Sequence, residues 1–139
     1  MTILLRISLL YLLFILFVMA KNILVDIDGT VCEDVDNEFS NRFSTARVLP
    51  GAVESINRFA NEGHSVTFFT ARTSEHKEDT IKWLDAHGFV YKDIIFNKPR
   101  SKGYPGGYVW IDNINVAAIT FKTWLSDQSG YSDLDECEN

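Results

Sequence analysis

Apolar and polar residues alternate along the chain in a pattern typical of an α/β protein. Short apolar runs predict strands over residues 22–26, 65–70, 93–96 and 108–111. Apolar residues at helical spacing predict helices over residues 50–62, 75–87 and 116–125, the first two followed by Gly63 and Gly88. Residues 31–49 are polar and irregular, which indicates a long loop or small hairpin over a site. Because strands and helices alternate, we expect an α/β domain with a mainly parallel sheet.

A polar side chain follows the end of each predicted strand. These residues are Asp28, Thr70, Lys98 and Asp112. The carboxyl ends of parallel strands lie at one edge of a sheet, so we expect the four side chains to converge on one crevice.

Two aspartates, Asp26 and Asp28, stand one residue apart where the first apolar run ends. Residues two apart share a face of a strand, so both carboxylates would address one ligand unless the strand ends between them. Neighbouring carboxylates repel each other, and a bound cation relieves that repulsion. The simpler interpretation is a strand followed by an aspartate-rich turn.

The composition and net charge limit the kinds of molecule that this domain is expected to bind. The 139 residues are 46% hydrophobic, enough for one domain with a real core, and the net charge is −6. That charge argues against nucleic-acid binding through a basic face, but it allows a small anionic substrate held by a few local cations. The two cysteines, Cys32 and Cys137, form no disulfide framework and no metal-thiolate spacing, and Cys32 has no neighbouring base that would make it a nucleophile.

The first twenty residues allow three interpretations. Residues 7–20 are almost all apolar, which is short for a membrane span and typical of the apolar part of a secretion signal. A chain that starts at Met19 would have an ordinary cytoplasmic N-terminus, and we favour this interpretation. A membrane anchor and a secretion signal are the alternatives, so membrane contact is expected only through residues 1–20.

Four motifs resemble those of the haloacid dehalogenase superfamily of Mg²⁺-dependent phosphatases and phosphotransferases. They are Ile-Leu-Val-Asp-Ile-Asp-Gly-Thr (23–30), Val-Thr-Phe-Phe-Thr-Ala-Arg (66–72), Asn-Lys-Pro (97–99) and Tyr-Val-Trp-Ile-Asp-Asn (108–113). The resemblance implies a Rossmann-like three-layer sandwich over residues 21–126. The acidic, serine-containing composition of residues 127–139 predicts a flexible tail. The segments between the motifs are too short for an inserted domain, so the resemblance implies a protein without a cap.

The resemblance also implies a role for each motif residue. Asp26 would attack phosphorus and become an aspartyl-phosphate, and Asp28 would act as general acid and base. Thr70 would bind a phosphoryl oxygen and Lys98 would neutralise charge. Mg²⁺ would be held by Asp26, Asp112 and the backbone carbonyl of Asp28.

Three further residues complete the expected site. Asn113 stands where many relatives have a second acid, and its side chain would orient a metal-bound water. Ala71 and Arg72 follow Thr70 and are expected to bind substrate. For Arg72, binding of a second anionic group and a surface ion pair at a helix entry are both open.

These expectations describe a Mg²⁺-dependent phosphomonoester hydrolase that acts on a sugar phosphate or nucleotide, with another subunit as one way to close its open site. One alternative is a phosphorylatable receiver-like signalling domain, although the third predicted strand lacks the acid that such a domain uses. The other is a non-catalytic binding module tethered to a membrane by the N-terminal segment.

Overall fold

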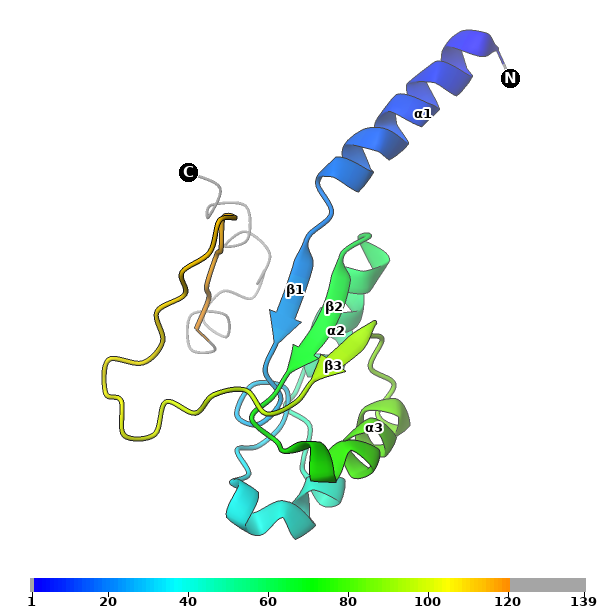
Figure 1. The fold of residues 1–139 in the computed structure, drawn as a ribbon. Coiled ribbons are helices and arrows are strands. Elements are labelled where there is room, and N and C mark those ends of the chain that lie inside the picture. Colours follow the sequence, from blue (N-terminus) through cyan, green and yellow to red (C-terminus); the bar gives the residue numbers. More distant parts are fainter. Residues whose placement is uncertain (1, 121–139) are drawn as a thin grey trace. The chain divides into compact units, whose positions relative to one another are not determined.

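The computed structural model describes residues 2–120, in two compact units, Met1–Lys98 and Pro99–Asn139, each described by itself below. All regular elements of the described residues belong to the first unit (Figure 1). In chain order they are α1 (Ile3–Val18), β1 (Asn22–Val25), the 3-10 helix η1 (Asn37–Thr45), α2 (Ala52–Asn61), β2 (Ser65–Phe69), the 3-10 helix η2 (Ser74–His76), α3 (Lys77–Ala86) and β3 (Asp93–Ile95).

The three strands form a parallel sheet in the order β1-β2-β3 (Figure 1). Asn22 pairs with Ser65, and Thr67 pairs with Asp93. Parallel neighbours need a long crossover connection, and α2 and α3 lie in the two crossovers. The predicted Rossmann-like α/β fold is confirmed, and the carboxyl ends of all three strands lie at the same edge.

The core forms where α2 packs on the sheet and α3 packs on η1. Ile56 and Phe59 of α2 are buried, and α2 packs on β2. From α3, the Trp83 indole donates a hydrogen bond to the carbonyl of Ala46 at 2.9 Å, which ties the helix to the chain after η1. Burial of each large apolar side chain contributes about 1.5–3 kcal/mol. The largest completely buried apolar side chains of the described residues are Ile27, Val31, Phe43, Ile56, Val66, Phe68 and Leu84.

The predicted ends of both crossover helices are confirmed. Gly63 and Gly88 follow α2 and α3 with φ of 92° and 78°, the left-handed conformation that glycine adopts without steric cost.

The segment over residues 31–49 is more ordered than a loop. It contains η1, and Cys32 pairs with Val48 in an isolated antiparallel bridge. Phe43 of η1 is completely buried and η1 contacts α3, so this segment is part of the core.

The predicted strand over residues 108–111 is wrong. These residues have no regular structure, and Val109 and Ile111 are 85% and 92% exposed. An apolar run forms a strand only where another strand supplies hydrogen bonds, and the sequence pattern does not contain that partner. Residues 116–120 of the last predicted helix are likewise not helical, whereas residues 121–125 and the predicted tail over 127–139 lie outside the described residues.

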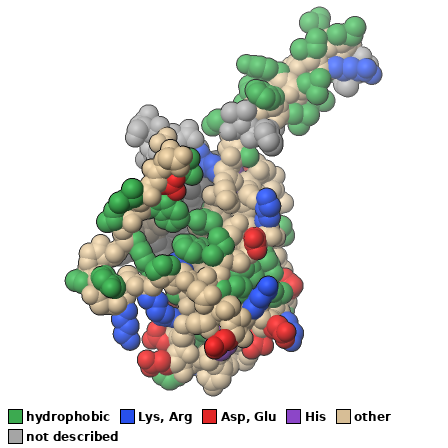
Figure 2. Space-filling model, viewed as in Figure 1, with side chains coloured by type: hydrophobic (Ala, Val, Ile, Leu, Met, Phe, Trp, Pro, Cys, Tyr) green, Lys and Arg blue, Asp and Glu red, His purple; other side chains and the backbone are tan. Residues whose placement is uncertain are grey.

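The N-terminal helix α1 carries apolar side chains that face solvent, and Arg6 is its one charged residue (Figure 2). Within residues 2–120, no helix combines the length and the apolar character that a membrane crossing requires. The three interpretations of this segment stay predictions.

Candidate active site

An ion pair joins the ends of β1 and β3. Lys98 Nζ lies 2.9 Å from Asp26 Oδ1, and the two side chains are 17% and 37% exposed. Asp26 is the first residue after β1, and Lys98 lies three residues after β3. The structure therefore places a partly exposed carboxylate and an ammonium group side by side at the predicted edge of the sheet.

A tight turn after β1 separates Asp26 from Asp28. The backbone N–H groups of Thr30 and Val31 donate to the carbonyl of Ile27, at 3.1 and 3.0 Å. Gly29 has φ of 77°, which a residue with a side chain adopts only with strain. Because β1 ends before both aspartates, the two carboxylates take different partners instead of sharing one face.

The partner of Asp28 is Arg72. Arg72 Nε donates to Asp28 Oδ2 at 2.9 Å, and Nη2 donates to Oδ1 at 2.8 Å. Arg72 is completely buried, and the Asp28 side chain is 14% exposed. Of the two interpretations left open for Arg72, the surface ion pair is therefore wrong, because Arg72 forms a buried pair that sequence reasoning missed. The two partners are 44 positions apart in the sequence, so no local pattern indicates the pair.

Backbone hydrogen bonds connect the residues after β2 to those after β3. The N–H of Lys98 donates to the carbonyl of Thr70 at 2.9 Å, and the N–H of Asn97 donates to the carbonyl of Arg72 at 2.9 Å. Asn97 has φ of 60°, and its side chain accepts a hydrogen bond from the N–H of Ser74. These contacts fix the backbone that carries Lys98 to Asp26.

Thr70 and Ala71 lie in this connected backbone. Thr70 is completely buried, and its Oγ1 accepts a hydrogen bond from the N–H of Arg72 at 3.1 Å. The hydroxyl proton of Thr70 is not used in that bond. Ala71 is half-buried, and its carbonyl accepts a hydrogen bond from Asn37 Nδ2 at 3.1 Å.

Cys32 lies beside Asp28 as a protonated thiol. Its Sγ is 3.6 Å from Asp28 Oδ1 and 3.6 Å from the carbonyl of Ile27. Burial, followed by the negative charge of Asp28, raises the pKa of the Cys32 thiol to about 12. A thiol is nucleophilic only when ionised, so the structure agrees with the expectation that Cys32 is not a nucleophile.

Asp112 and Asn113 belong to the second unit. The Trp110 indole donates to Asp112 Oδ2 at 3.0 Å, and the N–H of Asn113 donates to Oδ1 at 2.7 Å. These bonds, the first more than the second, lower the pKa of the exposed Asp112 carboxyl. No three His, Cys, Asp or Glu side chains gather at one point in residues 2–120, so the metal role of Asp112 stays a prediction.

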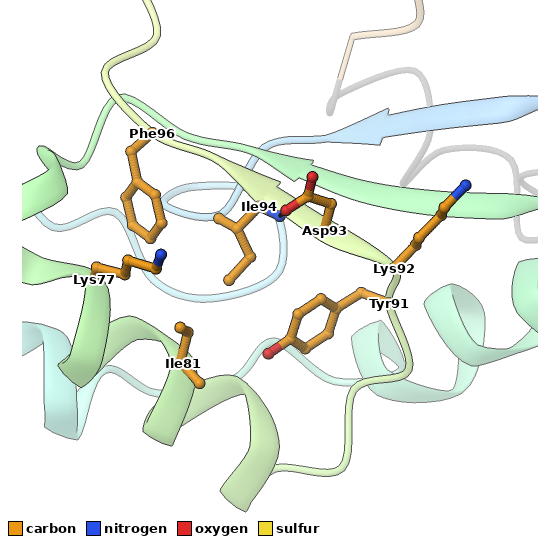
Figure 3. Close-up of a pocket in the computed structure, with 7 residues that line it drawn as sticks. All are labelled: Lys77, Ile81, Tyr91, Lys92, Asp93, Ile94 and Phe96. Carbon is orange, nitrogen blue, oxygen red and sulfur yellow. Dashed lines mark hydrogen bonds between the residues drawn. The ribbon is translucent and has the colours of Figure 1, made fainter.

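A separate cavity of about 260 Å³ lies between α3 and β3 (Figure 3). Ile81, Ile94 and Phe96 give it an apolar lining, with Lys77 and Lys92 as its cations. None of its lining residues belongs to the predicted site, which instead lies at the ends of the strands.

A family model and two curated proteins are similar in sequence to this chain. The family model described as "PITM 1-3, LNS2 domain" matches residues 23–105. A putative nucleotidase of Bacillus cereus is 38% identical over 55 residues, which are 39% of this chain and 29% of that protein. A putative 5′(3′)-deoxyribonucleotidase of Chlorobaculum tepidum is 29% identical over 83 residues, which are 55% of this chain and 41% of that protein. The chain thus spans less than half the length of either relative.

A solved structure has the same fold. It is a structural-genomics target from Vibrio cholerae, with a TM-score of 0.59 and 20% identity, and the match covers 84% of this chain and 98% of that one.

Proposed function

The chain belongs to the family of LNS2 domains of PITM 1-3 and is a member of the haloacid dehalogenase superfamily, and from this premise we propose that it is a Mg²⁺-dependent phosphomonoester hydrolase. The observation that carries the proposal is the pair formed by Asp26 and Lys98. A carboxylate attacks a phosphate dianion only if positive charge offsets their repulsion, and Lys98 supplies a point charge at that place.

The reaction takes place in two steps on this chain. In the first, an oxygen of Asp26 forms a bond to phosphorus while the bond to the leaving oxygen breaks, and Asp28 gives its proton to that oxygen. In the second, water attacks the aspartyl-phosphate and releases inorganic phosphate, and Asp28 takes the water proton. Lys98 offsets the charge of the phosphoryl group. The hydrogen bond from the Thr70 hydroxyl to a phosphoryl oxygen is implied by the resemblance alone, because the Thr70 side chain has no exposed surface.

The donor atoms near Asp26 suit a hard divalent cation. Mg²⁺ prefers carboxylate and carbonyl oxygens, and Asp26 offers a partly exposed carboxylate. Asp28 would contribute its backbone carbonyl, because its side chain is paired with Arg72. The roles of Asp112 as a further ligand and of Asn113 in orienting a bound water are implied by the resemblance alone. When bound, the ion neutralises charge on the transferring phosphoryl group.

The substrate class that we propose is a small phosphomonoester. The nucleotidase names of both relatives favour a nucleotide over a sugar phosphate. The net charge of −6 is consistent with a small substrate and with no role in binding nucleic acid.

Hydrolysis of p-nitrophenyl phosphate and of deoxynucleoside monophosphates tests the proposal. We expect many turnovers per protein molecule with Mg²⁺, loss of activity with a chelator, and no activity in Asp26→Asn. The matched control is Asp79→Asn, which changes an exposed carboxylate on α3 and is expected to keep full activity.

Two results would contradict the proposal. If Asp26→Asn keeps its activity, Asp26 is not the nucleophile. If the protein is phosphorylated once and does not turn over, the receiver-like alternative is correct.

A further inference from the structure

Arg72 is the most deeply buried charge of the described residues. It has no exposed surface, although its side chain is large and always ionised. A buried charge is costly unless it is paired and its hydrogen bonds are satisfied. The guanidinium meets this condition, because Nε and Nη2 donate to Asp28 and Nη1 donates to Thr80 Oγ1 at 3.3 Å.

Aromatic rings hold the guanidinium in this place. The Phe43 ring centre lies 4.1 Å from the guanidinium carbon, and the Trp83 ring centre lies 5.8 Å from it. Stacking on an aromatic face fixes the plane of the group. Arg72 has no exposed surface, and each of its three nitrogens already donates a hydrogen bond within the protein, so it is not placed to contact a phosphate on the substrate.

The pair in turn fixes the orientation of Asp28. Each oxygen of its carboxylate accepts one N–H of Arg72, so the plane of the carboxylate must match the plane of the guanidinium. A carboxylate has about four lone-pair positions, so two remain available after the paired contact. The side chain is 14% exposed, which leaves part of it within reach of a ligand.

We infer that Arg72 is a positioning residue that aims Asp28 at the leaving oxygen and does not bind substrate. The inference rests on the proposed function, because it assigns Arg72 to the general acid and base of that reaction. It replaces the expected substrate contact of Arg72. Lysine cannot perform this task, since its ammonium group lacks the planar fork that contacts both oxygens.

A double-mutant cycle tests the inference with p-nitrophenyl phosphate and Mg²⁺. Arg72→Met is expected to lower kcat about 10²-fold with KM unchanged, as misplacement of a catalytic group does. In an Asp28→Asn background, the same substitution should change kcat by less than about 3-fold, because the group it positions is already lost. Arg72→Lys should not restore kcat. Arg42→Met is the matched control, since it removes an exposed arginine paired with Glu33, and it should keep full activity.

A second readout does not depend on turnover. In the nitrogen-15 NMR spectrum, the Nε–H of Arg72 should exchange slowly with water, and its signal should move in Asp28→Asn. The signals of exposed arginines such as Arg42 should exchange rapidly in both proteins. This measurement uses the wild-type chain and Asp28→Asn, so it stands even where Arg72→Met does not fold.

Each contrary result has a distinct meaning. A rise in KM with unchanged kcat, or an equal loss in both backgrounds, overturns the inference in favour of substrate binding while the proposed hydrolase stands. A rapidly exchanging Arg72 Nε–H overturns the buried pair itself. A wild-type protein that hydrolyses no phosphomonoester overturns the proposed function and, with it, the role of Arg72.

Discussion

At the scale of single residues, the two neighbouring aspartates differ because their partners differ. Asp26 is partly exposed and lies against Lys98, whereas Asp28 is enclosed and paired with Arg72. Apolar runs place Asp26 and Lys98 at the ends of strands, so their meeting could be predicted from the sequence. The direction of the Arg72 side chain depends on packing against Phe43 and could not.

The raised pKa of Cys32 predicts that the stability of the protein falls at alkaline pH. Its folded pKa of about 12 lies above the ordinary thiol value of 9.0, so between these pH values the folded protein keeps a proton that the unfolded chain releases. The stabilisation is complete below pH 9 and is lost as the pH rises toward 12. Above about pH 9, the unfolding free energy should therefore fall with rising pH less steeply in Cys32→Ala than in wild type. The two slopes should differ by about 1.4 kcal/mol per pH unit.

Urea unfolding at a series of alkaline pH values measures both slopes. Tyr91 has a raised pKa, about 12, and titrates in both proteins, so it cancels in the comparison. Equal slopes would show that Cys32 ionises in the folded protein as it does in the unfolded chain.

At the scale of elements, the predicted helix ends are confirmed, whereas one predicted strand is wrong. Gly63 and Gly88 end their helices as predicted because glycine adopts a positive φ without strain. The run over residues 108–111 resembles a strand in composition but has no regular structure. Strand formation depends on a partner elsewhere in the chain, whereas a helix end depends on its own residues.

The turn that carries Asp28 gives a prediction at this scale. Gly29→Ala forces alanine to φ of 77° and should cost about 1–2 kcal/mol of stability. Because Gly29 adjoins Asp28, kcat should also fall, by about 10²-fold if the carboxylate moves by about 1 Å. Urea unfolding and phosphatase assays measure the two effects.

Gly88→Ala is the matched control, because Gly88 has φ of 78° and space around it but follows α3. It should lose similar stability and keep its kcat. An equal loss of kcat in both variants would indicate general destabilisation and contradict the role of the turn.

At the scale of the whole molecule, α1 differs from residues 19–98, which form the α/β part of the first unit. That part buries most of its large apolar side chains, whereas α1 exposes them, with Leu4 at 80% and Leu10 at 66%. The three interpretations of residues 1–20 share this apolar composition, so the preference for a start at Met19 over an anchor or a signal stays a prediction.

Removal of residues 1–18 tests whether the α/β part over residues 19–98 is stable without α1. A chain that starts at Met19 should keep its unfolding free energy within about 0.5 kcal/mol, since exposed side chains contribute little to the fold. It should also self-associate less, because exposed apolar surface promotes aggregation. Urea unfolding and analytical ultracentrifugation measure these effects, and a large loss of stability would mean that α1 supports the sheet.

Chemical trapping of the covalent intermediate tests the central claim most directly. The protein is mixed with Mg²⁺ and p-nitrophenyl phosphate, quenched, and treated with borohydride, which reduces an aspartyl-phosphate to homoserine. We predict homoserine at position 26 in wild type and at no position in Asp26→Asn. Homoserine at another aspartate, or rapid hydrolysis with none at position 26, would contradict the assignment of Asp26 as the nucleophile.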